Sequence, residues 1–361
     1  MPSDPAAPAH ALLVGYGSAG RGIHGPLLQQ AGFGITGVVT GNPERVAQVE
    51  QDLAGATAYP DLATALEAVA AGALAADVVV VATATGAHVE QARAAIEAGL
   101  PVVVDKPIAP DSAQAMELVD AARDQAALTV FQNRRYDPDV RTLAALVESG
   151  ELGEVVRAEM RWERWLSGPH DGWRGRESAD QGGGVLLDLH AHTVDAVVQL
   201  FGPVEIVYAE LAARGTVAES EAFLSLTHGS GVVSHLGVTG LSAAPGPRWR
   251  VMGTAGSYLV GGVEGEPGGL RELDDEDGHC GWLYDGQQRR PVAAAPHGQV
   301  DFYVAVRQAV ALAEQGVAAV QAAMPVDPED AVHVLAVLDA ARHCADNGQV
   351  ERVVTPGVGP A

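Results

Sequence analysis

A glycine motif directly follows the first apolar run of the chain. Leu12-Leu13-Val14 precedes Gly15, Gly17 and Gly20, which have the spacing G-x-G-x-x-G. In a dinucleotide-binding turn, the first glycine permits the tight turn. The second lets the backbone approach the pyrophosphate, and the third lets the helix pack close to the strand. The N–H groups at the start of that helix bind phosphate. The motif favours dinucleotide binding, although a chain with 43 glycines also allows an ordinary turn here.

Residues 8–130 alternate between strand-like and helix-like segments. The strand-like runs read ALLVG, GITGVVT, DVVVVAT, PVVVDK and LTVFQN, and the segments with helical spacing cover 18–31, 43–54, 61–73, 86–98 and 111–127. Continuous Val-rich strands separated by helices are typical of a parallel sheet that is covered on both faces. We therefore predict a doubly wound Rossmann domain, of the α/β class, over residues 8–130.

The pattern changes in residues 131–350. GEVVRAEMRWERW alternates as a long antiparallel strand does, and GGGVLLDLHAHTVDAVVQLFG predicts a helix from about Val185 to the glycine-proline pair. Further strand-like pieces cover 204–213, 222–228, 231–239 and 248–260; residues 261–299 read as surface loops around short strands, and two helices follow near 300–315 and 328–346. We predict an α+β domain with a large, mainly antiparallel open sheet. Its C-terminal helices could pack back on the first domain.

Charge and cysteine content exclude several classes of protein. The net charge of −24 repels nucleic acid and anionic membrane surfaces. The longest apolar run, AADVVVVATAT, is far shorter than the roughly 20 residues of a membrane span. The N-terminal MPSDPAAPAH lacks the basic start and apolar core of a signal peptide. Cys280 and Cys344 lack metal-site spacing, so we expect a reduced cytoplasmic protein.

The end of the second predicted strand bears on the choice of cofactor. NAD-selective sites usually place an acidic residue there to bind the ribose 2′-hydroxyl. This chain reads VVTGNPER, which puts Thr40, Asn42 and Arg45 at that place. A hydroxyl, an amide and a guanidinium suit a 2′-phosphate, so NADP is favoured over NAD. Glu44 leaves NAD open, and Arg45 could equally be an ordinary solvated helix residue.

Two further segments carry candidate catalytic groups. Lys106 follows a buried strand at the carboxyl edge of the predicted parallel sheet, where ligands bind in such folds. In the predicted helix from Val185, at about 100° per residue, Asp188 and His192 lie about 40° apart and Asp195 about 60° from His192. His190 lies about 200° from His192, on the far side. A His–Asp pair suits acid–base chemistry, although a cap and a buried histidine explain it equally well. Helical spacing disfavours a metal site at H-x-H, so no metal is predicted.

The sequence resembles the glucose–fructose oxidoreductase, inositol dehydrogenase and rhizopine-catabolism (Gfo/Idh/MocA) family over nearly its whole length. The resemblance rests on VGYGSAGRGIHGPLL, ATATGAHVEQARAAIEAGLPVVVDKPIA, FQNRRYDPDVRTLAALVESGELGEV, GWRGRESADQGGGVLLDLHAHTVDAVVQLFGPV and GWLYDGQQRRPV. It is strongest to the subgroup with NADP-dependent scyllo-inositol dehydrogenases. His190 departs from the family pattern, since relatives usually have glycine there, and we expect it to reshape the pocket.

The resemblance implies a set of site residues. Lys106, Asp188 and His192 match the family's active-site positions. Trp173-Arg174 match a cofactor contact, and Thr83, His88, Asn133 and Arg134 match the nicotinamide side or the substrate cleft. The predicted cofactor-binding set is Gly15, Tyr16, Gly17, Ser18, Ala19, Gly20, Thr40, Asn42, Arg45, Thr83, His88, Asp105, Lys106, Asn133, Trp173 and Arg174.

We therefore predict hydride transfer between NAD(P) and a secondary alcohol or ketone of a sugar or cyclic polyol. His192 would accept the hydroxyl proton, Asp188 would orient His192 or touch a substrate hydroxyl, and Lys106 would stabilise charge on the reacting oxygen. Two alternatives stay open: a glycoside-modifying enzyme that oxidises its substrate transiently, and a dinucleotide-binding regulator without turnover. The family also implies a homodimer or homotetramer.

Overall fold

The computed structural model describes residues 9–165, 178, 182–262 and 277–357. The chain forms two compact units. The first comprises residues up to Ala109, Ala113–Gln132 and Gln299–Ala331; the second comprises Pro110–Ser112, Asn133–Gly298 and Val332 onward.

The first unit contains a six-stranded sheet in which every strand pair is parallel. The strands lie in the order β3-β2-β1-β4-β5-β6. Their bounds are β1 Ala9–Val14, β2 Phe33–Val39, β3 Thr57–Tyr59, β4 Val78–Val81, β5 Val102–Asp105 and β6 Leu128–Phe131. The strand order reverses at β1, which is where doubly wound sheets bind their ligands. The predicted fold is confirmed, and β3 is a strand that the sequence pattern did not reveal because it has three residues.

Helices cover this sheet on both faces, since all four side chains of β4 are fully buried. Their bounds are η1 Gly20–His24, α1 Gly25–Gln30, α2 Pro43–Asp52, α3 Leu62–Ala70, η2 Thr85–Ala87, α4 His88–Glu97 and α5 Ser112–Ala122, followed much later by α9 Val300–Val310, η7 Ala313–Gln315 and α10 Val317–Ala322. The late helices complete this core. The rings of Phe302 and Tyr303 in α9 are fully buried and pack against Phe131 of β6.

The second unit contains a nine-stranded sheet in the order β14-β13-β12-β11-β7-β10-β9-β8-β15. The bounds are β7 Val155–Glu163, β8 Val204–Ala212, β9 Glu221–His228, β10 Val233–Thr239, β11 Trp249–Gly253, β12 Ser257–Val260, β13 His279–Tyr284, β14 Arg289–Ala293 and β15 Glu351–Arg352. The sheet is mixed: β7 is antiparallel to β11 but parallel to β10. A period of two residues reveals a strand but not its direction, so the sequence could not place this parallel pair.

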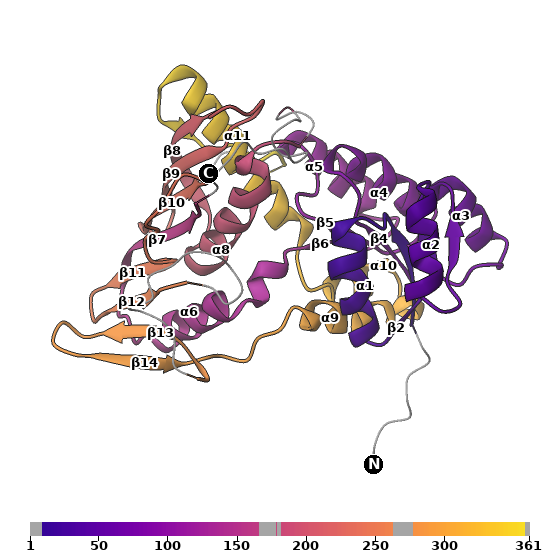
Figure 1. The fold of residues 1–361 in the computed structure, drawn as a ribbon, viewed down its shortest axis with the longest axis horizontal. Coiled ribbons are helices and arrows are strands. Elements are labelled where there is room, and N and C mark those ends of the chain that lie inside the picture. The colour runs from indigo at the N-terminus through magenta and orange to yellow at the C-terminus, as the bar shows by residue number, and fades with distance from the viewer. Residues whose placement is uncertain (1–8, 166–177, 179–181, 263–276, 358–361) are drawn as a thin grey trace, which may run out of the picture. The chain divides into compact units, whose positions relative to one another are not determined.

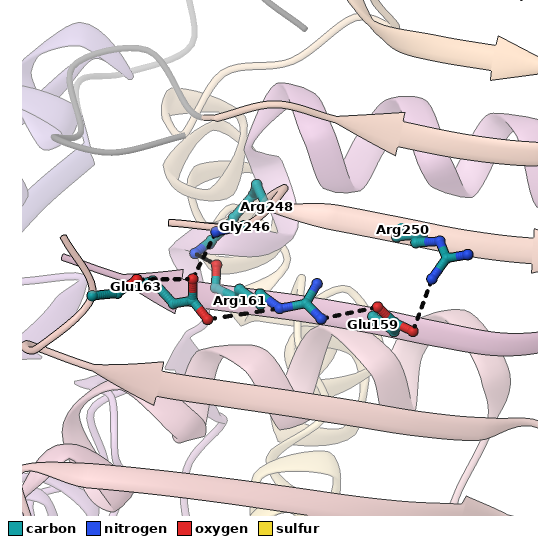
Figure 2. Close-up of polar contacts among 7 residues, drawn as sticks. Glu159, Arg161, Glu163, Gly246, Arg248 and Arg250 are labelled. Carbon is teal, nitrogen blue, oxygen red and sulfur yellow. Dashed lines mark hydrogen bonds and ion pairs between the residues drawn. The ribbon is translucent and has the colours of Figure 1, made fainter. Parts of the chain in front are cut away.

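Helices pack on one face of this sheet. Their bounds are η3 Asn133–Tyr136, α6 Pro138–Ser149, η5 Leu186–His190, α8 Ala191–Phe201 and α11 Pro328–Asn347. Figure 1 shows α6 and α8 along the sheet, and Trp249 of β11 donates its indole N–H to Asp139 of α6 at 3.0 Å. The other face is polar along β7, where Glu163, Arg161 and Glu159 form a row that continues to Arg250 of β11 (Figure 2). Within the described ranges, no helix is both long and apolar enough to cross a membrane.

Candidate active site

The glycine turn after β1 has no room for side chains at two of its three glycines. Gly15 has φ +95°, and a Cβ there would lie 2.7 Å from the carbonyl oxygen of Ala82. A Cβ on Gly20 would collide with the carbonyl oxygen of Gly15. Gly17 is half-buried, and a Cβ there would have only the guanidinium of Arg45 nearby, at 3.6 Å. The turn therefore presents bare backbone, as a pyrophosphate requires. These glycines fit a dinucleotide on geometric grounds.

Arg45, which follows β2, lies over the glycine turn, because the guanidinium that flanks Gly17 belongs to the first turn of α2. The side chain of Asn42 caps that helix: its Oδ1 accepts from the N–H groups of Glu44 at 2.9 Å and Arg45 at 3.3 Å. The side-chain NH2 group of Asn42 does not take part in this cap and can donate to a phosphate. Thr40 is buried, and its N–H donates to the carbonyl oxygen of Tyr59 at 2.9 Å. These contacts fix the start of α2 beside the glycines.

Tyr16 points toward the end of α2. Its hydroxyl donates to the Asp52 carboxylate at 3.2 Å, and Arg21 Nε donates to the same oxygen at 2.7 Å. Burial, with the nearby Asp52 carboxylate, raises the pKa of Tyr16 to about 12. Tyr16 is thus a neutral hydroxyl in the packing of the turn. Of the two residues that follow Gly17, Ser18 is exposed and Ala19 is half-buried.

The carboxyl ends of β4 and β5 are joined by His88. Its Nδ1 lies 2.8 Å from the carbonyl oxygen of Pro107, and its Nε2 lies 3.2 Å from that of Thr83. Burial lowers the pKa of His88 and keeps the ring neutral, so the shorter contact identifies Nδ1 as the donor. The hydroxyl of Thr83 donates to Gln91 Oε1 at 2.7 Å, and its methyl group faces Gly15. His88 therefore holds the Lys106–Pro107 turn against the end of β4.

Lys106 is half-buried at the end of β5, beside Asp105. Asp105 Oδ1 accepts from the backbone N–H of Lys106 at 2.9 Å, and the Lys106–Pro107 peptide is cis. Burial raises the pKa of Asp105, but His24, Lys106 and His88 outweigh burial and leave that pKa below its ordinary value. An ionised carboxylate therefore lies next to Lys106, the lysine expected to stabilise negative charge on the reacting oxygen.

In the second unit, the segment before α8 is a π-helical turn, Leu186–His190. Glu219 fixes its start: Oε1 accepts from the N–H of Leu186 at 3.0 Å, and its carbonyl oxygen accepts from Val185 at 2.9 Å. Gly184 lies against that carboxylate with φ +91°, so a side chain at 184 would displace it. The uniform spacing of about 100° per residue assumed from Val185 onward is therefore wrong across the π turn.

The three polar residues predicted on one helix face have different surroundings. Asp188 is half-buried in the π turn. His192 is 7% exposed and stacks on Trp162 of β7 with ring centroids 6.0 Å apart. Asp195 is buried and accepts two hydrogen bonds from Arg135, at 2.6 and 2.9 Å. Asp195 thus belongs to a buried ion pair between α8 and η3.

His190 is part of the core of the second unit. It has no exposed surface, its Nδ1 lies 2.8 Å from the Thr193 hydroxyl, and its Nε2 lies 3.3 Å from the carbonyl oxygen of Ala222. Burial lowers its pKa to about 4. Its ring therefore fills the space between η5 and β9.

Arginine side chains surround Trp162, on which His192 stacks. The guanidinium carbons of Arg248, Arg134 and Arg164 lie 4.2, 4.9 and 5.5 Å from the Trp162 ring centre. Arg134 also pairs with Asp137 at 2.8 Å, and Arg248 lies 3.6 Å from Asp139. Asn133 begins the same η3 turn and is half-buried. The sequence motif RWERW contains Trp162 and Arg164, but spacing alone did not connect them to His192.

Trp173 and Arg174, predicted to contact the cofactor, lie outside the described residues. Among the residues that the structure describes, no group of three or more His, Cys, Asp or Glu side chains could hold a metal ion. Cys280 and Cys344 are both buried, free thiols. Glu219, Arg135 and His24 were not predicted from the sequence, because each contacts its partner across a long sequence separation.

The burial of His190 predicts acid sensitivity of the fold. Its folded-state pKa of about 4 lies below the ordinary value of 6.5, so the unfolded chain binds more protons between these pH values. The free energy of unfolding is then highest above pH 6.5 and falls by about 3 kcal/mol toward pH 4 from this residue. We expect His190→Gln to flatten the pH dependence of the urea midpoint. His343→Gln, at an exposed position of α11, should not change it.

An NAD-binding oxidoreductase is the class of protein that this fold and glycine turn define. The first unit matches the model of the "oxidoreductase family, NAD-binding Rossmann fold" over residues 9–132, and residues 140–259 match the model of the "GFO/IDH/MocA C-terminal domain". The chain belongs to the GFO/IDH/MocA family of oxidoreductases.

Full-length relatives agree with this assignment. The chain is 26% identical to scyllo-inositol 2-dehydrogenase (NADP(+)) IolW of Bacillus subtilis over 351 residues, 91% of each chain. It is 30% identical to the uncharacterized oxidoreductase YdgJ of Escherichia coli over 82% of this chain and 87% of that one. The fold matches that of a levoglucosan dehydrogenase solved with NADH and levoglucosan, with a TM-score of 0.77 and 20% identity over 96% of this chain and all of the other.

Proposed function

We propose that the protein is an NADP-dependent dehydrogenase that oxidises a secondary alcohol of a sugar or cyclic polyol, or reduces the corresponding ketone. The proposal rests on one observation: the glycine turn after β1 exposes its backbone, and Lys106 lies at the end of β5 in the same sheet. The chain also contains Asp188 and His192. A bound nicotinamide would accept or donate the hydride at C4. Intact candidate catalytic groups disfavour the alternative of a regulator without turnover.

The chain's own groups would handle the proton and the developing charge. His192 would accept the hydroxyl proton, since histidine suits proton transfer near neutral pH. Asp188 would orient that ring or bind a neighbouring substrate hydroxyl. Lys106 would hydrogen-bond the reacting oxygen and stabilise its negative charge. Asp105 and His88 support Lys106 by fixing the main chain on either side of it.

A screen of polyols and sugars tests this function. Scyllo-inositol, myo-inositol, levoglucosan and common aldoses are incubated with NADP⁺ or NAD⁺, and absorbance of the reduced cofactor is followed. We expect net reduced cofactor with at least one cyclic polyol. Substrate turnover without net reduced cofactor would instead favour a glycoside-modifying enzyme with transient oxidation. Binding of NADPH without any turnover would favour a regulator.

Arg45 is proposed to select NADP by contacting the 2′-phosphate, with Thr40 and Asn42 beside it. Arg45 lies in the first turn of α2, just after β2, where the 2′ position of the adenosine ribose is bound in such folds. We expect Arg45→Ala to raise KM for NADP⁺ about 10–100-fold, the weight of a charge-assisted hydrogen bond, and to change KM for NAD⁺ little. Glu44→Ala, one position earlier on α2, is the control. Equal changes for both cofactors would remove Arg45 from this role.

The protein is also proposed to form a homodimer through the outer face of the nine-stranded sheet. Phe223 and His235 are half-buried on that face with ring centroids 5.9 Å apart, whereas neighbouring residues such as Leu224 point inward. The adjoining row of Glu163, Arg161, Glu159 and Arg250 alternates in charge (Figure 2), so a two-fold axis could pair it with itself.

Substitution at the centre of this face tests the dimer. We expect Phe223→Asp to convert the dimer to a monomer in light scattering at micromolar concentration, because the interface would bury an unpaired carboxylate. Phe223→Leu keeps the apolar surface and should remain dimeric. A monomeric wild-type protein would refute the proposal.

A further inference from the structure

His24 is a fully buried polar side chain that the proposed reaction does not use. It ends the π-helical turn Gly20–His24 that follows the glycine motif. Its ring packs on Phe131 with centroids 4.5 Å apart, and its Nδ1 lies 2.6 Å from the hydroxyl oxygen of Tyr303 in α9. Its Nε2 is buried and makes no hydrogen bond among the described residues, but it lies within ion-pair distance of the Asp105 carboxylate, 3.5 Å from Oδ2. His24 therefore links the glycine turn, α9 and the end of β5.

The Tyr303 and Asp105 contacts together indicate where the hydrogen of His24 lies. Burial, with the nearby Asp105 charge, raises the pKa of Tyr303 well above its ordinary value, so the phenol keeps its proton. The phenol could donate to Nδ1 or accept from it, but the ionised Asp105 carboxylate disfavours a lone pair on Nε2, so in a neutral His24 the ring hydrogen is on Nε2 and the Tyr303 hydroxyl donates to Nδ1. If His24 is protonated, Nε2 carries a hydrogen as well. In both states Nε2 carries a hydrogen and attracts the Asp105 carboxylate electrostatically across 3.5 Å.

The orientation of the Asp105 carboxylate affects the main chain at Lys106. One carboxylate oxygen faces His24, and the other accepts the backbone N–H of Lys106 at 2.9 Å. The side chain of Asp105 is 17% exposed, so water contributes little to its orientation. A phenylalanine pair would fill the same space as His24 and Tyr303 without the cost of burying polar atoms. The polar pair therefore has a cost that an interaction with Asp105 can offset.

We propose that His24 and Tyr303 are positioning residues for Lys106: they hold the Asp105 carboxylate in one orientation, and Asp105 fixes the main chain that carries the lysine. The role of Lys106 in this inference rests on the proposed function. The inference predicts that an N–H donor at the Nε2 position matters more than the presence of histidine itself.

Two substitutions test whether a donor at the Nε2 position is required, because asparagine and glutamine place the side-chain amide at different distances from the main chain. Glutamine at 24 places its amide near the Nε2 position, and asparagine places it near Nδ1. We expect His24→Asn to lower kcat about 10–100-fold, as small displacements of a catalytic group do, with KM for NADP⁺ unchanged. His24→Gln should keep the greater part of kcat. The assay uses NADP⁺ and scyllo-inositol, or the best polyol of the screen.

A signal from Lys106 itself gives a readout that does not depend on turnover. Lys106 is the only lysine in the sequence, so protein labelled with ε-¹³C-lysine gives one lysine signal in NMR. We expect this signal to shift in His24→Asn and to stay near its wild-type position in His24→Gln. Tyr303→Phe removes one buried hydroxyl and should shift the signal in the same direction as His24→Asn. It provides a second test if the His24 variants do not fold.

Equal kcat values and equal lysine signals in His24→Asn and His24→Gln would overturn the positioning role. A lower melting temperature in both variants, with kcat of the folded fraction unchanged, would also overturn the positioning role. Lys106→Met is assayed in parallel. If that variant keeps wild-type kcat, the proposed role of Lys106 fails, whereas the NMR comparison still decides whether His24 positions it.

Discussion

We expect His192→Asn to lower kcat for polyol oxidation by about 10²–10⁴-fold, the usual weight of general acid–base catalysis. The ring of His192 stacks on Trp162, which holds it in one orientation, and 7% of the residue is exposed to meet a substrate hydroxyl. Asparagine replaces the imidazole with a polar amide that cannot accept the hydroxyl proton at neutral pH. Steady-state kinetics with NADP⁺ and scyllo-inositol, with NADPH binding measured by fluorescence, check the result.

His190→Gln is the matched control, because it alters a histidine two residues away. His190 is fully buried between Thr193 and Ala222, so its replacement should lower stability and leave kcat of the folded enzyme close to wild type. The reverse result, with turnover lost in His190→Gln and retained in His192→Asn, would contradict the assignment of His192.

Much of the first unit could be predicted because its signals are local. Continuous Val-rich runs such as Val78–Val81 give β4 directly, and the glycine spacing gives the turn after β1. Strand β3 was missed because Thr57–Tyr59 is too short to show a period. Asn42 was predicted as a phosphate ligand, and its pattern alone did not reveal that Oδ1 also caps α2. The same side chain can serve both purposes through its two ends.

The candidate site of the second unit was harder to predict because it departs from regular geometry. The π turn Leu186–His190 is a wider turn before α8, and the hydrophobic pattern of the sequence does not reveal it. Glu219 fixes that turn from a loop 33 residues away in sequence. Asp195 satisfies the helical spacing from His192, yet Arg135 binds its carboxylate. Regular helical angles therefore identified the right segment but could not assign partners within it.

We expect Lys106→Met to lower kcat by about 10²–10³-fold, the effect of removing one donor that stabilises charge in a transition state. The side chain is half-buried at the end of β5, and Asp105 and His88 fix the main chain around it. Methionine keeps the length and apolar stem but removes the ammonium, so NADPH binding measured by fluorescence should survive while kcat falls.

Lys106→Arg sharpens this test. Lys106 is the one lysine among the 22 Lys and Arg residues of the sequence, which suggests that a compact ammonium is required at this position. A guanidinium retains the positive charge but is larger and planar, so its N–H groups should not occupy the position of the lysine ammonium beside the reacting oxygen. We therefore expect Lys106→Arg to lose most of the kcat that Lys106→Met loses. Wild-type kcat in Lys106→Met would show that the reacting oxygen is stabilised by another group.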